Sequence, residues 1–154
     1  MKVTVIGSGG WGTALALVLE ENGHDVTLWS HRKEKAQELK RNRENPMLKG
    51  VPLPERLRLT ADFDSVRESQ AVIMVTPSYA VRETAAKLCG IVQPGTVIVS
   101  ASKGIEKESS LRLSQVIEAE LGEQCPVVVL SGPSHAEEVG RHIPTGVVAA
   151  ADRL

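Results

Sequence analysis

The sequence predicts an α/β protein, in which a doubly wound, mainly parallel sheet carries helices on both faces. The first observation is a set of short, nearly continuous apolar segments, at 2–6, 71–75, 96–100 and 127–130. Such segments are typical of parallel strands, which are buried on both faces. The second is that segments with helical periodicity separate these strands along the chain. The third is a length of 154 residues, which suits one domain with a sizeable core.

The first strand runs directly into a glycine-rich turn. Residues 2–6 are followed by Gly7, Gly9 and Gly12, and an apolar helical segment at 11–21 comes next. This is the G-x-G-x-x-G spacing of a dinucleotide-binding turn in a Rossmann-type fold: Gly7 permits the tight turn, Gly9 lets a pyrophosphate approach the backbone, and Gly12 lets helix and strand pack closely. A tight turn without a ligand is the alternative, but it does not require three glycines in this context.

The next elements complete a strand–helix–strand unit. The helix at 11–21 is apolar nearly all round, which predicts that it is largely buried, and Asn22-Gly23 ends it. A strand at 26–30 and a polar helix at 34–43 follow, and in that helix Ala36, Leu39 and the stem of Lys40 are expected to face inward. Residues 44–56 read as a long loop, which in a compact domain is usually functional or flexible.

The remaining elements alternate in the same way. The sequence predicts a short strand at 58–60 and a short helix at 63–68 before the buried strand at 71–75, which Thr76-Pro77 ends. Further along the chain we expect a helix at 79–89, a strand at 96–100, a helix at 109–121, a strand at 127–130, a short helix through Val139 and a final strand at 146–150.

Composition argues against several classes of function. The formal net charge of −1 does not favour bulk binding to nucleic acid or to an anionic membrane, and 3% aromatic residues make a base-stacking platform improbable. No apolar segment reaches membrane-spanning length and no signal peptide precedes the first strand, so we expect no membrane insertion and a cytoplasmic location. Cys89 and Cys125 are expected to be reduced, small, buried or half-buried side chains.

No metal site is predicted. The four histidines, His24, His31, His135 and His142, show no ligand spacing, and neither cysteine pairs with them. His135 is conceivable as an acid, although a lone histidine beside a turn is more often structural.

The end of the second strand bears on the choice of cofactor. A site for NAD usually has Asp or Glu about twenty residues beyond the last glycine, whereas this chain has Arg32 there, between His31 and Lys33. Arginine binds a 2′-phosphate through paired N–H groups. We therefore expect NADP or NAD as the cofactor, with NADP favoured and dual use allowed. A solvated basic helix start is the alternative.

Polar segments follow three later strands, at 76–78, 102–104 and 131–134. Open α/β sheets bind ligands at the carboxyl ends of their strands. Lys103 comes directly after a buried strand, so its ammonium group is expected to point into the crevice, where it can bind a phosphate or polarise a carbonyl. A surface lysine is the alternative reading.

Four segments together resemble the N-terminal half of the bacterial-type NAD(P)-dependent glycerol-3-phosphate dehydrogenases. They are residues 7–14, 29–32, 100–106 and 131–136, and the resemblance covers essentially the whole chain. The tryptophan after the glycines, the lysine loop and the Ser-Gly-Pro-Ser turn are more specific in this order than the glycines alone. The resemblance implies an oxidoreductase that interconverts dihydroxyacetone phosphate and sn-glycerol 3-phosphate and supplies phospholipid synthesis.

The same resemblance implies roles for individual residues. Gly10 and Trp11 contact the pyrophosphate region of the cofactor, and His31 and Arg32 hold its adenosine end. Lys103 touches both cofactor and substrate. The rest of the implied site lies near the end of the chain, where Gly132 and Ser134 line the substrate pocket and Ala136 lies at the nicotinamide end.

Two departures from the family are visible. Met47 stands where the family's loop often has an aromatic residue. The sequence ends at Leu154, so we expect residues 1–154 to be the dinucleotide-binding domain and the helical substrate domain to be absent. That domain carries the lysine that relays the proton and the arginine that grips the substrate phosphate. No catalytic residue is therefore expected in this chain, which alone is expected to be inactive, and the full enzyme is expected to form a homodimer.

Two alternatives stay open at this point. One is a related NADP-dependent reductase of a small keto or hydroxy acid, such as a ketopantoate reductase, which shares the first thirty or so residues. The other is a nucleotide-sensing regulatory module of the same architecture that binds a nucleotide without turnover. Fold alone does not decide between them.

Overall fold

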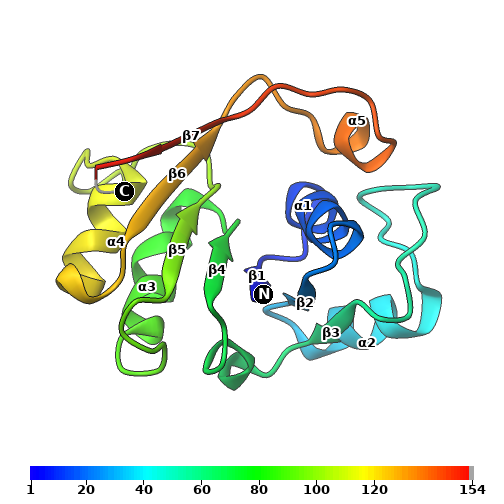
Figure 1. Ribbon diagram of the computed structural model, residues 1–154, viewed down its shortest axis with the longest axis horizontal. Coiled ribbons are helices and arrows are strands. Elements are labelled where there is room, and N and C mark those ends of the chain that lie inside the picture. The colour runs from blue at the N-terminus through cyan, green and yellow to red at the C-terminus, as the bar shows by residue number, and fades with distance from the viewer. Residues whose placement is uncertain (153–154) are drawn as a thin grey trace.

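The computed structural model describes residues 1–152 and contains one seven-stranded sheet (Figure 1). The strands lie in the order β3-β2-β1-β4-β5-β6-β7, and every neighbouring pair is parallel except β6 and β7. Their bounds are β1 Lys2–Ile6, β2 Asp25–Trp29, β3 Arg58–Thr60, β4 Ala71–Met74, β5 Val97–Ser100, β6 Val127–Ser131 and β7 Val148–Ala151. The predicted doubly wound, mainly parallel sheet is therefore confirmed.

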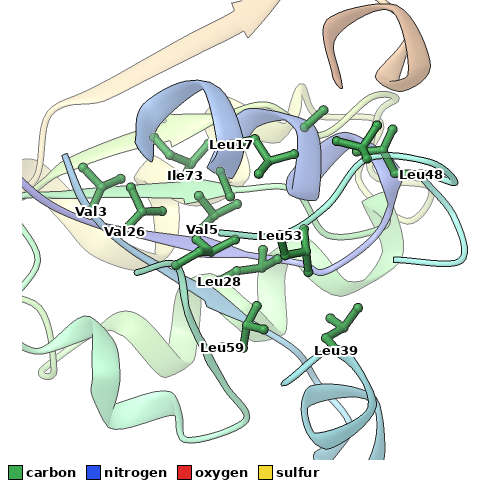
Figure 2. Close-up of a cluster of buried hydrophobic side chains, with 14 of the residues drawn as sticks. Val3, Val5, Leu17, Val26, Leu28, Leu39, Leu48, Leu53, Leu59 and Ile73 are labelled. Carbon is green, nitrogen blue, oxygen red and sulfur yellow. The ribbon is translucent and has the colours of Figure 1, made fainter. Parts of the chain in front are cut away.

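The helices lie on both faces of this sheet. Their bounds are α1 Gly10–Glu21, α2 Lys33–Asn42, α3 Val81–Leu88, α4 Leu113–Leu121 and α5 Ala136–Gly140, with 3-10 turns η1 Phe63–Val66, η2 Ser78–Ala80 and η3 Gly122–Gln124. One core cluster joins α1 to alternate strand residues such as Val5 and Leu28 (Figure 2). A second joins α3 and α4 to the residues that point the other way, such as Ile6 and Ile98. Six residues of α1 are buried, as its composition predicts.

The segment between α2 and β3 is a well-packed loop. It begins after Arg43, whose φ of 49° ends α2, and it places Leu48, Val51, Leu53 and Leu57 in the core under α1. The sequence predicts that a loop of this length is either functional or flexible. The burial of these side chains argues against a flexible loop.

Several predicted boundaries are wrong for identifiable reasons. The helix expected from 109 begins at Leu113, because Ser110 adopts φ 59° and Ile105 pairs with Arg112 in an isolated antiparallel bridge. The helix expected at 79–89 is a 3-10 turn followed by α3, and the helix expected at 63–68 is the 3-10 turn η1. The predicted burial of two residues is also wrong, because Lys40 and Cys89 are both exposed.

The last strand runs against the others. The sequence predicts a final strand at 146–150 in a mainly parallel sheet and does not give its direction; β7 spans Val148–Ala151 and is antiparallel to β6. A parallel neighbour needs a crossover that returns along the full strand. The only helix between β6 and β7 is α5, whose five residues measure about 7.5 Å and pack on α1 instead. The chain therefore turns back along the edge of the sheet. Within residues 1–152, no helix has the length and apolar character needed to cross a bilayer.

Candidate active site

A groove of about 900 Å³ opens at the carboxyl ends of β1, β2, β4 and β5. This edge is where an open α/β sheet binds its ligands, beside the point at which the strand order reverses. Its lining comes from the glycine turn, the end of β2, the turn after β4, the loop after β5 and the start of α5. The residues concerned are Gly7, Ser8, Gly9, Trp11, Trp29–Arg32, Lys35, Met47, Phe63, Val75–Pro77, Tyr79, Ala80, Glu83, Thr84, Lys87, Ala101–Lys103 and Ser134–Ala136.

The glycines of the turn answer different steric needs. Gly7 has φ +122°, and a Cβ there would lie 2.5 Å from the carbonyl oxygen of Val75. A Cβ on Gly12 would overlap the carbonyl oxygen of Gly7, so α1 can approach β1 closely only because Gly12 has no side chain. Gly9 differs from both, since it has φ −74° and a Cβ there would meet no atom within 4 Å. Its missing side chain leaves open space in the groove.

The start of α1 is suited to an anion. Gly9 is the N-cap residue, and the first intrahelical bond runs from the Thr13 amide to the Gly9 carbonyl at 3.0 Å. In residues 1–152, no side chain caps this helix and its first turn holds no acidic residue. The amide groups of the first turn and the positive end of the helix dipole therefore face the groove without a competing carboxylate.

The end of β2 gives the groove a basic border. His31 and Arg32 are exposed and Lys35 is half-buried, and all three line the groove. Glu83 and Lys87 of α3 also line the groove; Lys87 donates to Glu83 at 2.7 Å, and this hydrogen bond lowers the pKa of the Glu83 carboxyl. The arrangement can hold a phosphate at this end of the groove through charge-assisted hydrogen bonds.

All four aromatic residues of the chain line this groove, namely Trp11, Trp29, Phe63 and Tyr79. Trp29 and Phe63 meet edge to face with centroids 5.3 Å apart. Two buried polar atoms of the lining, Trp29 Nε1 and Thr76 Oγ1, have no hydrogen-bond partner among the residues that the structure describes. Buried polar groups normally have partners, so these atoms fit a polar, partly aromatic ligand such as a nicotinamide dinucleotide.

Lys103 lies in a loop that is fastened to two helices. The exposed lysine follows β5 and reaches the groove, while Glu106 of the same loop is buried. Glu106 accepts from Arg82 Nε and Nη2 at 2.8 and 2.7 Å and from Ser109 Oγ at 2.5 Å. Arg82 also donates to Glu120 of α4. The Arg82 hydrogen bonds lower the pKa of the Glu106 carboxyl from 4.5 to about 2, so this carboxylate stays charged and bound.

The segment at 131–136 closes the groove on the side of α5. Ser134 is buried and lines the groove with His135 and Ala136. The Ala136 Cβ lies 3.4 Å from where a Gly10 Cβ would stand, which brings the start of α5 against the start of α1. Gly132 packs against Gly146 and Val147 and is outside the groove lining.

The structure thus brings together most of the residues expected at the site. Gly7, Gly9, Trp11, His31, Arg32, Lys103, Ser134 and Ala136 line one groove, whereas Gly10, Gly12 and Gly132 are not among its lining residues. Phe63 and Tyr79, which also line the groove, were missed by sequence reasoning. For Phe63 and Tyr79 a signal existed, because an aromatic residue in a chain with so few of them is a candidate for a ligand contact.

A second groove, of about 720 Å³, lies along the outer face of β1, β2 and β3. Most of its basic residues are engaged in ion pairs, including Lys2 with Glu68, Arg58 with Asp25 and Arg67 with Asp64. It is therefore a weaker candidate for an anionic ligand. The structure shows no cluster of three or more potential metal ligands in the described part of the chain.

Comparison with known proteins identifies the relatives of this chain. A family described as the NAD-dependent glycerol-3-phosphate dehydrogenase N-terminus matches residues 2–154. A glycerol-3-phosphate dehydrogenase [NAD(P)+] of Desulfitobacterium hafniense is 47% identical over 150 residues, which cover 97% of this chain and 42% of the relative. The corresponding enzyme of Fusobacterium nucleatum is 44% identical over 154 residues, covering 98% and 46%.

A solved structure agrees with this result. The crystal structure of glycerol-3-phosphate dehydrogenase from Coxiella burnetii superposes with a TM-score of 0.92 at 36% identity, covering 99% of this chain and 47% of that one. The chain therefore spans about half the length of the relatives it matches. Similarity at this level along the whole chain favours the predicted relation to glycerol-3-phosphate dehydrogenases over the two alternatives, a reductase of a small keto or hydroxy acid and a nucleotide-sensing regulatory module.

Proposed function

The chain belongs to the NAD-dependent glycerol-3-phosphate dehydrogenase family, whose N-terminal region it represents, and from this membership we propose that it is the cofactor-binding domain of such an enzyme. The full enzyme would interconvert dihydroxyacetone phosphate and sn-glycerol 3-phosphate and supply the latter to phospholipid synthesis. One observation carries the proposal: a single groove joins the uncapped start of α1, a basic border and Lys103.

The cofactor would lie along this groove. Gly9 and the first turn of α1 would face the pyrophosphate, with Trp11 beside them, while Gly7, Gly10 and Gly12 allow the close packing that shapes the turn. His31 and Arg32 would hold the adenosine end, and Ala136 would lie near the nicotinamide. When bound, the reduced nicotinamide supplies a hydride to the ketone carbon.

Lys103 and Ser134 would hold the substrate. The ammonium group of Lys103 is exposed in the groove and can bind the phosphate of dihydroxyacetone phosphate or stabilise negative charge on its carbonyl oxygen. The buried Ser134 lines the same groove and offers a hydroxyl, and the Gly132 carbonyl accepts from the Ser134 amide in the turn that carries it. No catalytic residue is assigned to this chain; the lysine that relays the proton would come from the second domain.

The cofactor is proposed to be NADP or NAD, with NADP favoured. The support is the basic border, where Arg32 stands in the place at which NAD-specific sites have a carboxylate. We further propose that the full enzyme contains a helical substrate domain, forms a homodimer and works in the cytoplasm. The free thiols of Cys89 and Cys125 are consistent with that compartment.

The test is a titration of the 154-residue chain with NADPH and with NADH. Calorimetry measures binding, and melting curves recorded with and without each cofactor measure the stabilisation. The matched control is Gly9→Val. Because Gly9 has φ −74° and open space around it, valine should fit the protein, and its side chain would stand where the pyrophosphate must approach. We expect both cofactors to raise the melting temperature of the wild type but not of the variant. An equal rise for the variant would show that the pyrophosphate does not lie on this turn.

A further inference from the structure

Asn45 is a fully buried amide in the loop between α2 and β3, with a relative exposure of 0%. Its Nδ2 donates to the Ser8 carbonyl at 3.0 Å and to Thr13 Oγ1 at 2.6 Å, and its Oδ1 accepts from the Met47 amide at 3.1 Å. The partners fix the orientation of the amide, because a carbonyl can only accept and a backbone N–H can only donate. One side chain therefore joins the glycine turn, the first turn of α1 and the loop.

The bond to Ser8 sets the direction of a peptide group in the site. A trans peptide is planar, so its N–H points opposite to its C=O. The Ser8 carbonyl is drawn inward to Asn45, and the N–H of Gly9 in the same peptide unit is consequently turned away from Asn45. Ser8 and Gly9 both line the groove, and Gly9 is the N-cap of α1. The amide that Asn45 orients is thus one of the free donors at the helix start.

We infer that Asn45 is a positioning residue for cofactor binding, which holds the Ser8–Gly9 peptide so that the Gly9 N–H donates to the pyrophosphate. This inference rests on the proposed function and adds a residue that affects cofactor affinity although it is outside the groove lining. Asn45 would not touch the cofactor. It would act through the Ser8–Gly9 peptide, which does touch the cofactor. By holding this peptide in place, Asn45 would remove the entropy cost of ordering the Gly9 N–H when the ligand binds.

Anchoring of the loop does not by itself explain Asn45. Arg43 donates to the carbonyls of Pro54 and Leu57, both at 3.1 Å, and Arg56 pairs with the buried Glu20 of α1. The apolar side chains of the loop are in the core as well. The loop would remain attached without Asn45, whereas no other side chain within residues 1–152 is seen to hold the Ser8 carbonyl.

The sharpest substitution is Asn45→Asp. It keeps the shape of the side chain and the acceptor for the Met47 amide, but it replaces the donor with a carboxylate oxygen facing the Ser8 carbonyl. The matched control is Asn42→Asp, the same chemical change at an exposed position at the end of α2. Two ligands serve as probes: NADPH, and adenosine 2′-monophosphate, which reaches the adenosine end but has no pyrophosphate. Calorimetry follows the first, and chemical shifts in NMR spectra follow the second.

We expect Asn45→Asp to weaken NADPH binding about tenfold or more, the effect of losing one hydrogen bond to a charged group. Its affinity for adenosine 2′-monophosphate should match that of the wild type, and Asn42→Asp should change neither. Equal weakening for both ligands would indicate a general structural role and overturn the inference, as would unchanged NADPH binding.

A second variant covers the case in which Asn45→Asp does not melt cooperatively. Thr13→Val removes one acceptor of the Asn45 amide and leaves the groove lining intact. It should therefore weaken NADPH binding selectively, by a smaller factor than Asn45→Asp does. A Thr13→Val protein that binds both ligands as the wild type does would then count against the inference. Failure of the wild type to bind either NADPH or NADH would instead refute the proposed function.

Discussion

At the residue scale, Arg32 is the side chain on which cofactor choice should depend. It is exposed at the basic border of the groove, in the place where a carboxylate would select NAD. Arg32→Asp removes a cation from the 2′-phosphate and puts a repelling carboxylate there. A hydrogen bond to a charged group contributes roughly 1.5–3 kcal/mol. We therefore expect NADPH binding to fall about tenfold or more while NADH binding changes little, as measured by calorimetry.

Lys33→Asp is the control for this experiment. Lys33 is also exposed and adjacent in sequence, but it begins α2 and is outside the groove lining. Both substitutions change the net charge equally, so a general electrostatic effect on the anionic cofactor would appear in both variants. Equal losses of NADPH and NADH binding in Arg32→Asp would mean that Arg32 does not read the 2′ position.

Sequence reasoning at this scale located residues that are tied to a local pattern. Gly7 and Gly12 could be predicted because the strand–turn–helix order fixes their steric tasks, and both are closely packed in the structure. Asn45 could not, because its partners Ser8 and Thr13 lie more than thirty residues away in sequence. Its importance depends on where the loop folds back, and no periodicity records that.

At the element scale, the loop after β5 depends on a carboxylate that fastens Lys103 to the fold. Glu106 binds Arg82 of α3 and Ser109, and the pKa of its carboxyl is about 2 in the folded protein, compared with 4.5 ordinarily. A carboxyl whose pKa is lowered on folding stabilises the folded state above its unfolded pKa. That contribution is lost as the pH falls from about 4.5 toward 2.

Glu106→Gln should therefore melt at a lower temperature than the wild type at neutral pH. The difference between the two proteins should shrink as the pH falls through that window. Glu108→Gln, at an exposed position in the same loop, is the control and should melt like the wild type throughout. Melting curves recorded across this pH range provide the measurement. A difference that stays constant with pH would show that the charge of Glu106 does not contribute to stability.

The same loop shows why some element boundaries could not be predicted. Residues 109–112 have no Gly or Pro to exclude a helix, yet α4 begins only at Leu113. Tertiary contacts decide the matter, since Glu106 and the bridge between Ile105 and Arg112 hold the preceding residues in a turn. The strands were easier to predict, because burial on both faces leaves continuous apolar segments in the sequence.

At the scale of the whole molecule, the sheet is covered unevenly. α1 and the loop at 43–57 cover one face, and α3 and α4 cover the other. β6 is only half-buried for most of its length and β7 is exposed throughout. Along the groove, Lys103, His31 and Arg32 are exposed. The groove proposed above for the cofactor is therefore formed within residues 1–152, while Lys103, which we propose to hold the substrate, is left exposed.

This contrast predicts that the 154-residue chain binds NADPH but does not turn over dihydroxyacetone phosphate. Hydride transfer requires the reacting atoms to be held about 3–3.5 Å apart and water to be excluded. Lys103 and Ser134 alone leave the substrate mobile in an open groove, and we assign the proton relay to a second domain. The relatives, about twice as long, have room for one.

The measurement is the absorbance of NADPH over time with saturating dihydroxyacetone phosphate, alongside calorimetry that establishes binding. Binding without a steady-state loss of absorbance is the expected result, and a full-length relative serves as the positive control. Gly9→Val, which should not bind cofactor, separates a slow background oxidation from reaction in the groove. Sustained oxidation of NADPH by the wild-type chain, abolished in Gly9→Val, would show that these residues contain a complete active site and that no second domain is needed for turnover.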